Sequence, residues 1–259
     1  MTIRIAHLSD IHFGGEIPEA VEASIEAVAA FAPTLTAVTG DLTLNGLPRE
    51  FRDVGRWLAR FPGPMLVTPG NHDTPYWNLV LRALTPFARY RRYVGAANFS
   101  AFDASGLAVR SLSSARGAQP RLDWSKGAMS IVQVRKLDWG HHAAGGVRVF
   151  ACHHPLIEIE GAPVTGAVHR GAEAVAQLVE EGVELILTGH VHVPFVLPVL
   201  ADTVCYNVGA GTLSIRTRGT PPSFSTIVAD EKTFEITEMA WSGQRFEPAR
   251  TWSLPRAVR

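Results

Sequence analysis

The stretch ELILTGHVHVPF, residues 184–195, passes from an apolar run straight into a glycine and two histidines. The run is short, largely aliphatic and partly β-branched, which is typical of a strand buried in a parallel sheet. Gly189 permits a tight turn, and His190 and His192 follow it. One pair of histidines after one strand is a weak signal, so its value depends on how the other strands end.

Four other short apolar runs also predict buried strands, and polar residues follow each of them closely. Because the carboxyl ends of parallel strands lie side by side, ligands from distant segments can meet in one cavity there. The four runs and the residues after them are IRIAHLS (3–9) with Asp10 and His12, TLTAVT (34–39) with Gly40 and Asp41, PMLVT (64–68) with Asn71, His72 and Asp73, and VRVFAC (147–152) with His153 and His154.

Helical periodicity separates these predicted strands. Apolar residues recur at helical spacing in three segments, residues 17–28, 51–61 and 175–179. Proline or glycine follows each segment, as expected at the end of a helix. Strands that alternate with helices indicate an α/β fold built on parallel strands.

The part of the chain after Pro198 has a different pattern. Glycine, threonine and serine interrupt its apolar residues, which predicts strands over 203–219 and 223–241 with a hairpin turn at 230–232. No linker or internal repeat separates this part from the rest. Residues 1–259 are therefore predicted to form a single domain.

The residues at the strand ends form a set of metal ligands without thiolates. Carboxylate, imidazole and amide donors suit Fe, Mn or Zn in a reactive site rather than a structural zinc bound by cysteines. This many donors exceeds the need of one tetrahedral ion but suits two ions that share a bridging carboxylate. The predicted ligands are Asp10, His12, Asp41, Asn71, His153, His190 and His192.

Together, the motifs at the strand ends resemble the five signatures of the calcineurin-like metallophosphoesterases. A later stretch, GAGTLSIRTRGTPPSF (209–224), is similar to an element of the bacterial cyclic-nucleotide-phosphodiesterase-type members. The resemblance implies an α/β fold, a four-layer α/β-β-α sandwich with mixed sheets, and a dinuclear site at the strand ends. The five motifs, in the family's order, are DIH (10–12), GD (40–41), GNHD (70–73), HHP (153–155) and GHVH (189–192).

The resemblance also implies a role for each motif residue. His72 would interact with the phosphate and protonate the leaving group, and Asp73 would orient the His72 imidazole. The expected mechanism is attack on phosphorus by a metal-bound hydroxide, with Asn71 helping to stabilise the phosphoryl oxygens. By position, one metal would be held by Asp10, His12, Asp41 and His192, and the other by Asp41, Asn71, His153 and His190, with Asp41 as the bridge.

Residues next to the predicted ligands are candidates for substrate contact. His154 is expected either behind the metal site or facing the substrate, and Asn45 follows the GD motif by a few residues. Tyr76 and Trp77 follow the GNHD motif and are placed to stack on a base or another leaving group. The segment that they begin, residues 76–94, reads either as an amphipathic helix with a basic solvent face or as a rim over the site.

Composition narrows the possible partners. Lys+Arg 24 and Asp+Glu 24 give a formal net charge of +0, which argues against extended nucleic acid and anionic membranes as partners. No apolar stretch reaches transmembrane length and the first residues lack the pattern of a signal peptide. The two cysteines, Cys152 and Cys205, lie in apolar runs. A cytoplasmic protein is expected, and the sequence predicts no oligomeric state.

The ligand set and the family resemblance, above all that of residues 209–224, imply a dinuclear-metal-dependent phosphodiesterase that hydrolyses small phosphodiesters of the cyclic nucleotide or glycerophosphodiester type. A phosphomonoesterase or promiscuous phosphatase is the main alternative, because the same metal site serves both reactions. A nuclease is less favoured because the balanced charge supplies no basic groove. A binding scaffold without catalysis is less favoured because the ligand set is intact.

Overall fold

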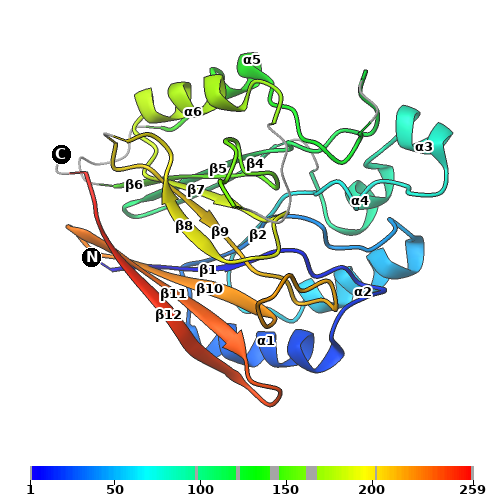
Figure 1. Cartoon of the computed structure of the whole chain (residues 1–259), viewed down its shortest axis with the longest axis horizontal. Helices are drawn as coiled ribbons and strands as arrows, with labels where there is room; N and C mark the ends of the chain where they lie inside the picture. Colours follow the sequence, from blue (N-terminus) through cyan, green and yellow to red (C-terminus); the bar gives the residue numbers. More distant parts are fainter. Residues whose placement is uncertain are drawn as a thin grey trace.

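Two six-stranded mixed sheets form the centre of the protein in the computed structural model, which describes residues 2–96, 99–120, 123–140, 146–161, 168–201 and 203–257 (Figure 1). In the first sheet the neighbours of β1 are β2, which is parallel, and β10, which is antiparallel. The order of this sheet is β12 (Phe246–Pro255), β11 (Thr233–Trp241), β10 (Ser223–Ala229), β1 (Ile3–Leu8), β2 (Leu35–Val38) and β3 (Met65–Val67).

The second sheet has a parallel centre with antiparallel edges. Its four middle strands run parallel, and each outer strand pairs antiparallel with its neighbour. The order is β4 (Phe99–Ala104), β5 (Leu107–Leu112), β6 (Val147–Ala151), β7 (Leu185–Thr188), β9 (Tyr206–Gly209) and β8 (Phe195–Pro198).

Helices cover the outer face of each sheet, so the described part of the chain has four layers (Figure 1). The helices α1 (Pro18–Phe31) and α2 (Pro48–Leu58) pack on the first sheet. On the second sheet pack α5 (Ile131–Val134) and α6 (Gly171–Glu180). One apolar cluster lies between each helical layer and its sheet, and a third lies between the two sheets. This arrangement confirms the predicted four-layer α/β-β-α sandwich with mixed sheets.

Local sequence explains the longest helix. Pro18 occupies its first turn, where a missing N–H costs nothing, and Val21, Ile25 and Val28 are buried against the first sheet. Ala32 ends the helix in the left-handed conformation, and its N–H donates to carbonyls of the last turn. The helix therefore ends just before Pro33, as the sequence predicts.

All five strands predicted to precede the motifs are present, but they do not belong to one sheet. Three of them, β1, β2 and β3, lie in the first sheet, and β6 and β7 lie in the second. The expectation of one shared sheet edge is therefore corrected to two edges, which lie next to each other at one end of the sandwich. The hairpin predicted at 230–232 is confirmed, since Asp230 Oδ1 accepts the N–H groups of Lys232 and Thr233 at 2.7 Å.

Two segments differ from the prediction. Residues 76–94 form two short helices rather than one, α3 (Leu79–Leu84) and α4 (Ala88–Tyr93), because Pro86 cannot continue a helix. The predicted strand over 203–219 ends at Gly209, and the remainder is a loop that continues toward the strand ends. None of the helices in the described ranges is long and apolar enough to cross a membrane.

Candidate metal centre

The first group of predicted ligands meets at the carboxyl ends of β1, β2 and β7. One ligand atom from each of four side chains lies within 4.8 Å of the others, and all four residues are buried. His192 Nε2 lies 3.1 Å from Asp10 Oδ1, and His12 Nε2 lies 3.8 Å from Asp41 Oδ2. The four residues are Asp10, His12, Asp41 and His192.

The backbone at this site is strained. Five of the seven non-glycine residues with left-handed φ in the described part of the chain are predicted ligands. Of the other two, Ala32 is the C-cap of α1, where this conformation is common, and Arg170 is the N-cap of α6. Such conformations persist only where the surroundings enforce them, and they gather at functional sites. The five ligands are Asp10 (φ 56), His12 (φ 51), Asp41 (φ 50), His190 (φ 70) and His192 (φ 62).

Several buried oxygen and nitrogen atoms of the predicted metal ligands have no hydrogen-bond partner within the described residues. They include Asp10 Oδ1, Asn71 Oδ1 and His153 Nε2. A buried polar atom without a partner costs about 1–3 kcal/mol, so three of them in one place need an explanation. All three are oxygen or nitrogen atoms of the kinds that bind first-row metals. The residues therefore fit a metal site.

The second group lies beside the first. His153 Nε2 is 3.3 Å from Asp41 Oδ2, which places Asp41 between the two groups as a bridging ligand requires. The rings of His153 and His190 are 5.2 Å apart. Ligand atoms of His153, His154 and His190 also lie within 4.8 Å of one another. This second cluster has three imidazoles and adjoins the carboxylate of the first.

His154, predicted as a substrate contact, is only 2% exposed. Its Nε2–H donates to the carbonyl of Ser125 at 2.7 Å, and Ser114 Oγ–H donates to its Nδ1 at 2.8 Å. Both ring nitrogens are thus occupied inside the protein. These hydrogen bonds favour the expected position behind the metal site over the position facing substrate.

Backbone carbonyls orient two of the imidazoles. The Nδ1–H of His153 donates to the Thr39 carbonyl at 2.7 Å, and that of His192 donates to the Arg216 carbonyl at 2.8 Å. A proton on Nδ1 leaves the lone pair on Nε2, which in both residues faces a carboxylate of the cluster. This is the usual way in which a protein fixes the tautomer of a ligating histidine.

Electrostatics keep two of the four predicted histidine ligands in the form that binds metal. Burial lowers the pKa of His12 to about 3 and the pKa of His190 to about 4, so both imidazoles are neutral near pH 7. For the other two, nearby carboxylates outweigh burial: Asp41 raises the pKa of His153 to about 9, and Asp10 raises the pKa of His192. Burial alone would raise the pKa of Asp41, but His153 and His72 beside it hold that pKa well below its ordinary value. Neutral imidazoles next to ionised carboxylates are what a cation needs.

The glycines ahead of the ligands act in two different ways. Gly40 adopts a left-handed φ of 92°, which confirms a turn that favours glycine. Gly70 and Gly189 do not have a left-handed φ, so a tight turn is not their reason. A Cβ at Gly70 would lie 2.1 Å from Asp41 Oδ1, and one at Gly189 would lie 2.4 Å from Asp10 Oδ2. Here glycine lets a carboxylate approach the backbone.

The family resemblance implies that Asp73 orients the imidazole of His72, but in the structure Asp73 has other partners. Its carboxylate accepts the backbone N–H groups of Leu42, Thr43 and Gly70, which joins the GD and GNHD loops. The imidazole is held instead by the Leu44 carbonyl, which accepts its Nδ1–H at 2.7 Å. Asp73 is fully buried, and the backbone N–H groups around its carboxylate saturate it before it can reach the ring.

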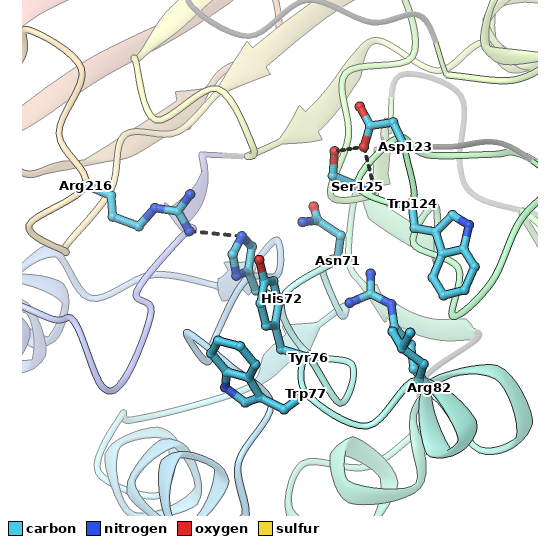
Figure 2. Close-up of a pocket in the computed structure, with 10 residues that line it drawn as sticks. Asn71, His72, Tyr76, Trp77, Arg82, Asp123, Trp124, Ser125 and Arg216 are labelled. Atoms are coloured by element: carbon cyan, nitrogen blue, oxygen red, sulfur yellow. Dashed lines mark hydrogen bonds between the residues drawn. The ribbon is translucent and has the colours of Figure 1, made fainter.

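A cavity of about 640 Å³ opens beside the cluster (Figure 2). Tyr76 and Trp77 line it, as predicted for substrate contacts, and the ring of Tyr76 stacks on that of His72 at 6.3 Å. Asn45 does not line it, because its side chain is directed toward Glu50, with Nδ2 3.5 Å from Oε1. The lining residues are Asn71, His72, Tyr76, Trp77, Leu79, Arg82, Asp123, Trp124, Ser125 and Arg216.

The sequence reading missed several of these residues. Arg216 Nη1 donates to His72 Nε2 at 2.9 Å, from the loop that follows β9 (Figure 2). Glycines 209 and 211 follow a short apolar run there, so the strand-end pattern used elsewhere would have found this loop. Trp124 and Ser125 lie in the segment after β5, a strand that the sequence analysis did not identify. No comparable signal marked those two residues.

Comparison with known proteins agrees with this geometry. Residues 3–194 match the calcineurin-like phosphoesterase family. A probable cyclic nucleotide phosphodiesterase from Synechococcus sp. is 26% identical, over 76% of this chain and 76% of that protein.

Solved structures show the same fold at low sequence identity. A purple acid phosphatase from yellow lupin is similar with a TM-score of 0.62 and 13% identity, covering 99% of this chain and 54% of the phosphatase. A dimetal phosphatase from Danio rerio is similar with a TM-score of 0.60 and 11% identity, covering 98% and 99% of the two chains. With the family match over most of its length, the chain belongs to the calcineurin-like phosphoesterases.

Proposed function

We propose that this chain is a metal-dependent phosphodiesterase that hydrolyses small phosphodiesters, of the cyclic nucleotide or glycerophosphodiester type. The observation that carries the proposal is the meeting of buried carboxylates and imidazoles from distant segments beside an open cavity that Asn71 and His72 line. The relative from Synechococcus, named a probable cyclic nucleotide phosphodiesterase, supports a diester over a monoester. Phosphomonoester hydrolysis is the second candidate, because the same cluster suits both.

The donor set divides between two cations that share Asp41. We assign Asp10, His12 and His192 to one cation and Asn71, His153 and His190 to the other. Oxygen and nitrogen donors of this kind suit Fe, Mn or Zn. The unpartnered atoms of Asp10, Asn71 and His153 support the assignment, because a cation supplies the interaction that each of them lacks.

When bound, a metal pair supplies positive charge that polarises a phosphoryl group and activates water as the nucleophile. The protein's own contribution is to hold the phosphoryl group at the cavity floor. Asn71 and Arg216 line that floor with N–H donors for phosphoryl oxygens, which is the arrangement that stabilises developing negative charge. His72 lies between them, and we assign it the protonation of the departing alkoxide, which requires Nε2 to release the hydrogen bond from Arg216 Nη1 and to carry a proton.

Other features fit a small-molecule enzyme. The cavity is of the size that holds a small ligand, and the balanced net charge does not favour nucleic acid as a partner. We also propose that residues 1–259 form one domain. The cytoplasmic location stays a prediction from the sequence.

The proposal is tested by a substrate screen of the full chain loaded with Mn. The panel contains cyclic AMP, glycerophosphodiesters, aryl monoesters and diesters, and single-stranded DNA. Cleavage of small diesters is expected to exceed that of monoesters and DNA. Cleavage of monoesters alone would make this a phosphatase, and no metal-dependent cleavage of any ester would make it a binding scaffold.

A further inference from the structure

Arg82 of α3 has an unusual position for an arginine in a segment rich in basic residues. The sequence of residues 76–94 is compatible with a solvated basic face, yet Arg82 is 7% exposed and lines the cavity. Its Nε donates to the Gly117 carbonyl at 3.0 Å, which fixes the side chain. Figure 2 shows the guanidinium directed into the cavity beside Asn71 and Trp124.

The charge of Arg82 has no counterion nearby. No carboxylate within the described ranges forms an ion pair with it, and its one hydrogen bond leaves the Nη donors for the cavity. Desolvation by burial lowers its pKa, and the smaller opposing effects come from Tyr76 and from Asp41 at the metal cluster. A buried charge is costly unless it is paired, so an anion is the partner that would satisfy it.

Arg82 is separate from the residues assigned to the scissile phosphoryl group. Figure 2 shows Arg216 beside His72 on one side of Asn71 and Arg82 beside Trp124 on the other. The guanidinium carbon of Arg82 lies 5.9 Å from the centre of the Trp124 ring. The two arginines thus serve different parts of the same cavity.

Aromatic side chains line both parts of the cavity, Tyr76 and Trp77 near His72 and Trp124 near Arg82. Tyr76 and Trp77 are 47% and 76% exposed, although aromatic rings usually seek burial, and Trp124 is partly exposed. Rings in such positions can stack on a planar group of a ligand. The cavity therefore offers a flat apolar surface and, at its inner side, an arginine fork for an oxyanion.

We propose that Arg82 and Trp124 form a subsite for a second oxyanion, a carboxylate or phosphate carried on an aromatic or nucleobase-bearing substituent of the phosphodiester. This inference rests on the proposed function, because it concerns a substituent of the ester that would be hydrolysed. Within that function, it predicts that small diesters with an additional negative charge on one arm are hydrolysed in preference to those without one, such as cyclic AMP.

Binding is measured first, with two ligands that no phosphoesterase cleaves. Phenylphosphonate and 4-carboxyphenylphosphonate differ only in the carboxylate and are titrated calorimetrically into the Mn-loaded full chain. The carboxylate is expected to tighten binding at least about tenfold, as a charge-assisted hydrogen bond to a buried guanidinium does. In Arg82→Gln, which keeps a donor for the Gly117 carbonyl but loses the charge, the two ligands should bind alike.

Two further variants complete the binding experiment. Arg89 is the matched control, since it also donates to one backbone carbonyl, that of Gly46, but does not line the cavity. Arg89→Met should keep the preference for the carboxylate. Arg82→Lys keeps the charge but loses the fork, so an intermediate preference is expected, and this variant replaces Arg82→Gln if that protein does not fold.

Kinetics then separate this inference from the proposed function. The substrates are p-nitrophenyl phenyl phosphate and p-nitrophenyl 4-carboxyphenyl phosphate, compared by kcat/KM in wild type and Arg82→Gln. A preference for the carboxylated ester that the variant loses supports the subsite. Equal losses on both esters, or a preference unchanged in the variant, overturn it. If neither ester is hydrolysed but the carboxylated phosphonate still binds more tightly, the proposed function is rejected and the subsite is supported.

Discussion

The Nε2 atoms of His12 and His192 lie 3.2 Å apart, although the two residues are separated by 180 positions in the chain. Histidine nitrogens bound to one cation at about 2.0–2.1 Å, in tetrahedral or octahedral geometry, are themselves about 2.9–3.4 Å apart. The observed separation falls in that range. The protein therefore already holds these two imidazoles at the spacing of ligands to a shared ion.

Asp41→Ala should abolish hydrolysis and lower metal content below that of the wild type. Asp41 lies between the two clusters, with Oδ2 3.3 Å from His153 Nε2 and 3.8 Å from His12 Nε2, so its loss removes a ligand from both. Metal per chain, measured by elemental analysis after gel filtration, checks the prediction. Asp53→Ala, on the exposed face of α2, is the control and should keep both metal and activity. Full turnover with both metals bound in Asp41→Ala would refute the assignment.

His72→Ala should slow hydrolysis while the metal content stays unchanged. Its ring lies at the cavity between the Leu44 carbonyl and Arg216, and none of its ring atoms belongs to the metal clusters. General acid catalysis contributes about 10²–10⁴-fold, and the need for it grows as the leaving group becomes more basic. The loss should therefore be larger for an alkyl ester than for a p-nitrophenyl ester. An equal rate on the alkyl ester would remove His72 from the reaction.

The sequence predicted the strands and their polar ends because each of these signals is local. A buried strand shows as an apolar run, and the residues after it can be read directly, as with Asp10 after β1 or His153 after β6. The resemblance to a family then supplied the arrangement of layers. The assignment of individual ligands to metals stays a prediction, which the geometry supports.

The parts that the sequence did not predict depend on contacts between distant segments. Asp73 and His72 are neighbours in sequence, but backbone N–H groups from another loop occupy the carboxylate of Asp73. In the sequence, Arg82 is one of several arginines in a basic segment. In the structure, its hydrogen bond to the Gly117 carbonyl holds it at the cavity. The spacing of apolar residues predicts which residues of a helix or strand are buried. It does not predict which loop covers them.

Gly189→Ala should weaken metal binding and destabilise the fold. An added Cβ would lie 1.8 Å from Ser9 Oγ and 2.4 Å from Asp10 Oδ2, so the Asp10 carboxylate would have to move. Overpacking of this kind typically costs about 1–3 kcal/mol. Thermal unfolding with and without Mn checks both effects, since a bound metal stabilises the folded state by an amount that grows with the logarithm of its affinity.

Gly55→Ala is the matched control for this substitution. At Gly55, within α2, the added Cβ would meet its nearest atom at 3.5 Å, an ordinary contact. Alanine favours a helix over glycine by up to about 1 kcal/mol, so this variant should be as stable as the wild type or more stable. If both variants lost the same stability and the same Mn-dependent stabilisation, the close approach at Gly189 would not be the cause.

His7 should make the protein less stable as the pH falls below the ordinary pKa of histidine. It is fully buried in β1, where Nε2 lies 2.9 Å from Thr39 Oγ1, and burial lowers its pKa from 6.5 to about 3. Between those two pH values the unfolded chain binds a proton that the folded chain does not bind. The contribution of His7 to the free energy of unfolding is therefore fully present above about pH 6.5. Below that pH it falls by about 1.4 kcal/mol per pH unit.

Urea unfolding of the metal-free protein at pH 7.5 and pH 5 measures this effect, with His7→Leu as the comparison. The wild type should lose about 2 kcal/mol more than His7→Leu between the two pH values, because the leucine has no proton to bind. The other buried histidines are present in both proteins, so the difference isolates His7. The lost contact with Thr39 shifts the variant's stability equally at both pH values and leaves the slope unaffected. Parallel losses in the two proteins would show that His7 is not held neutral by burial.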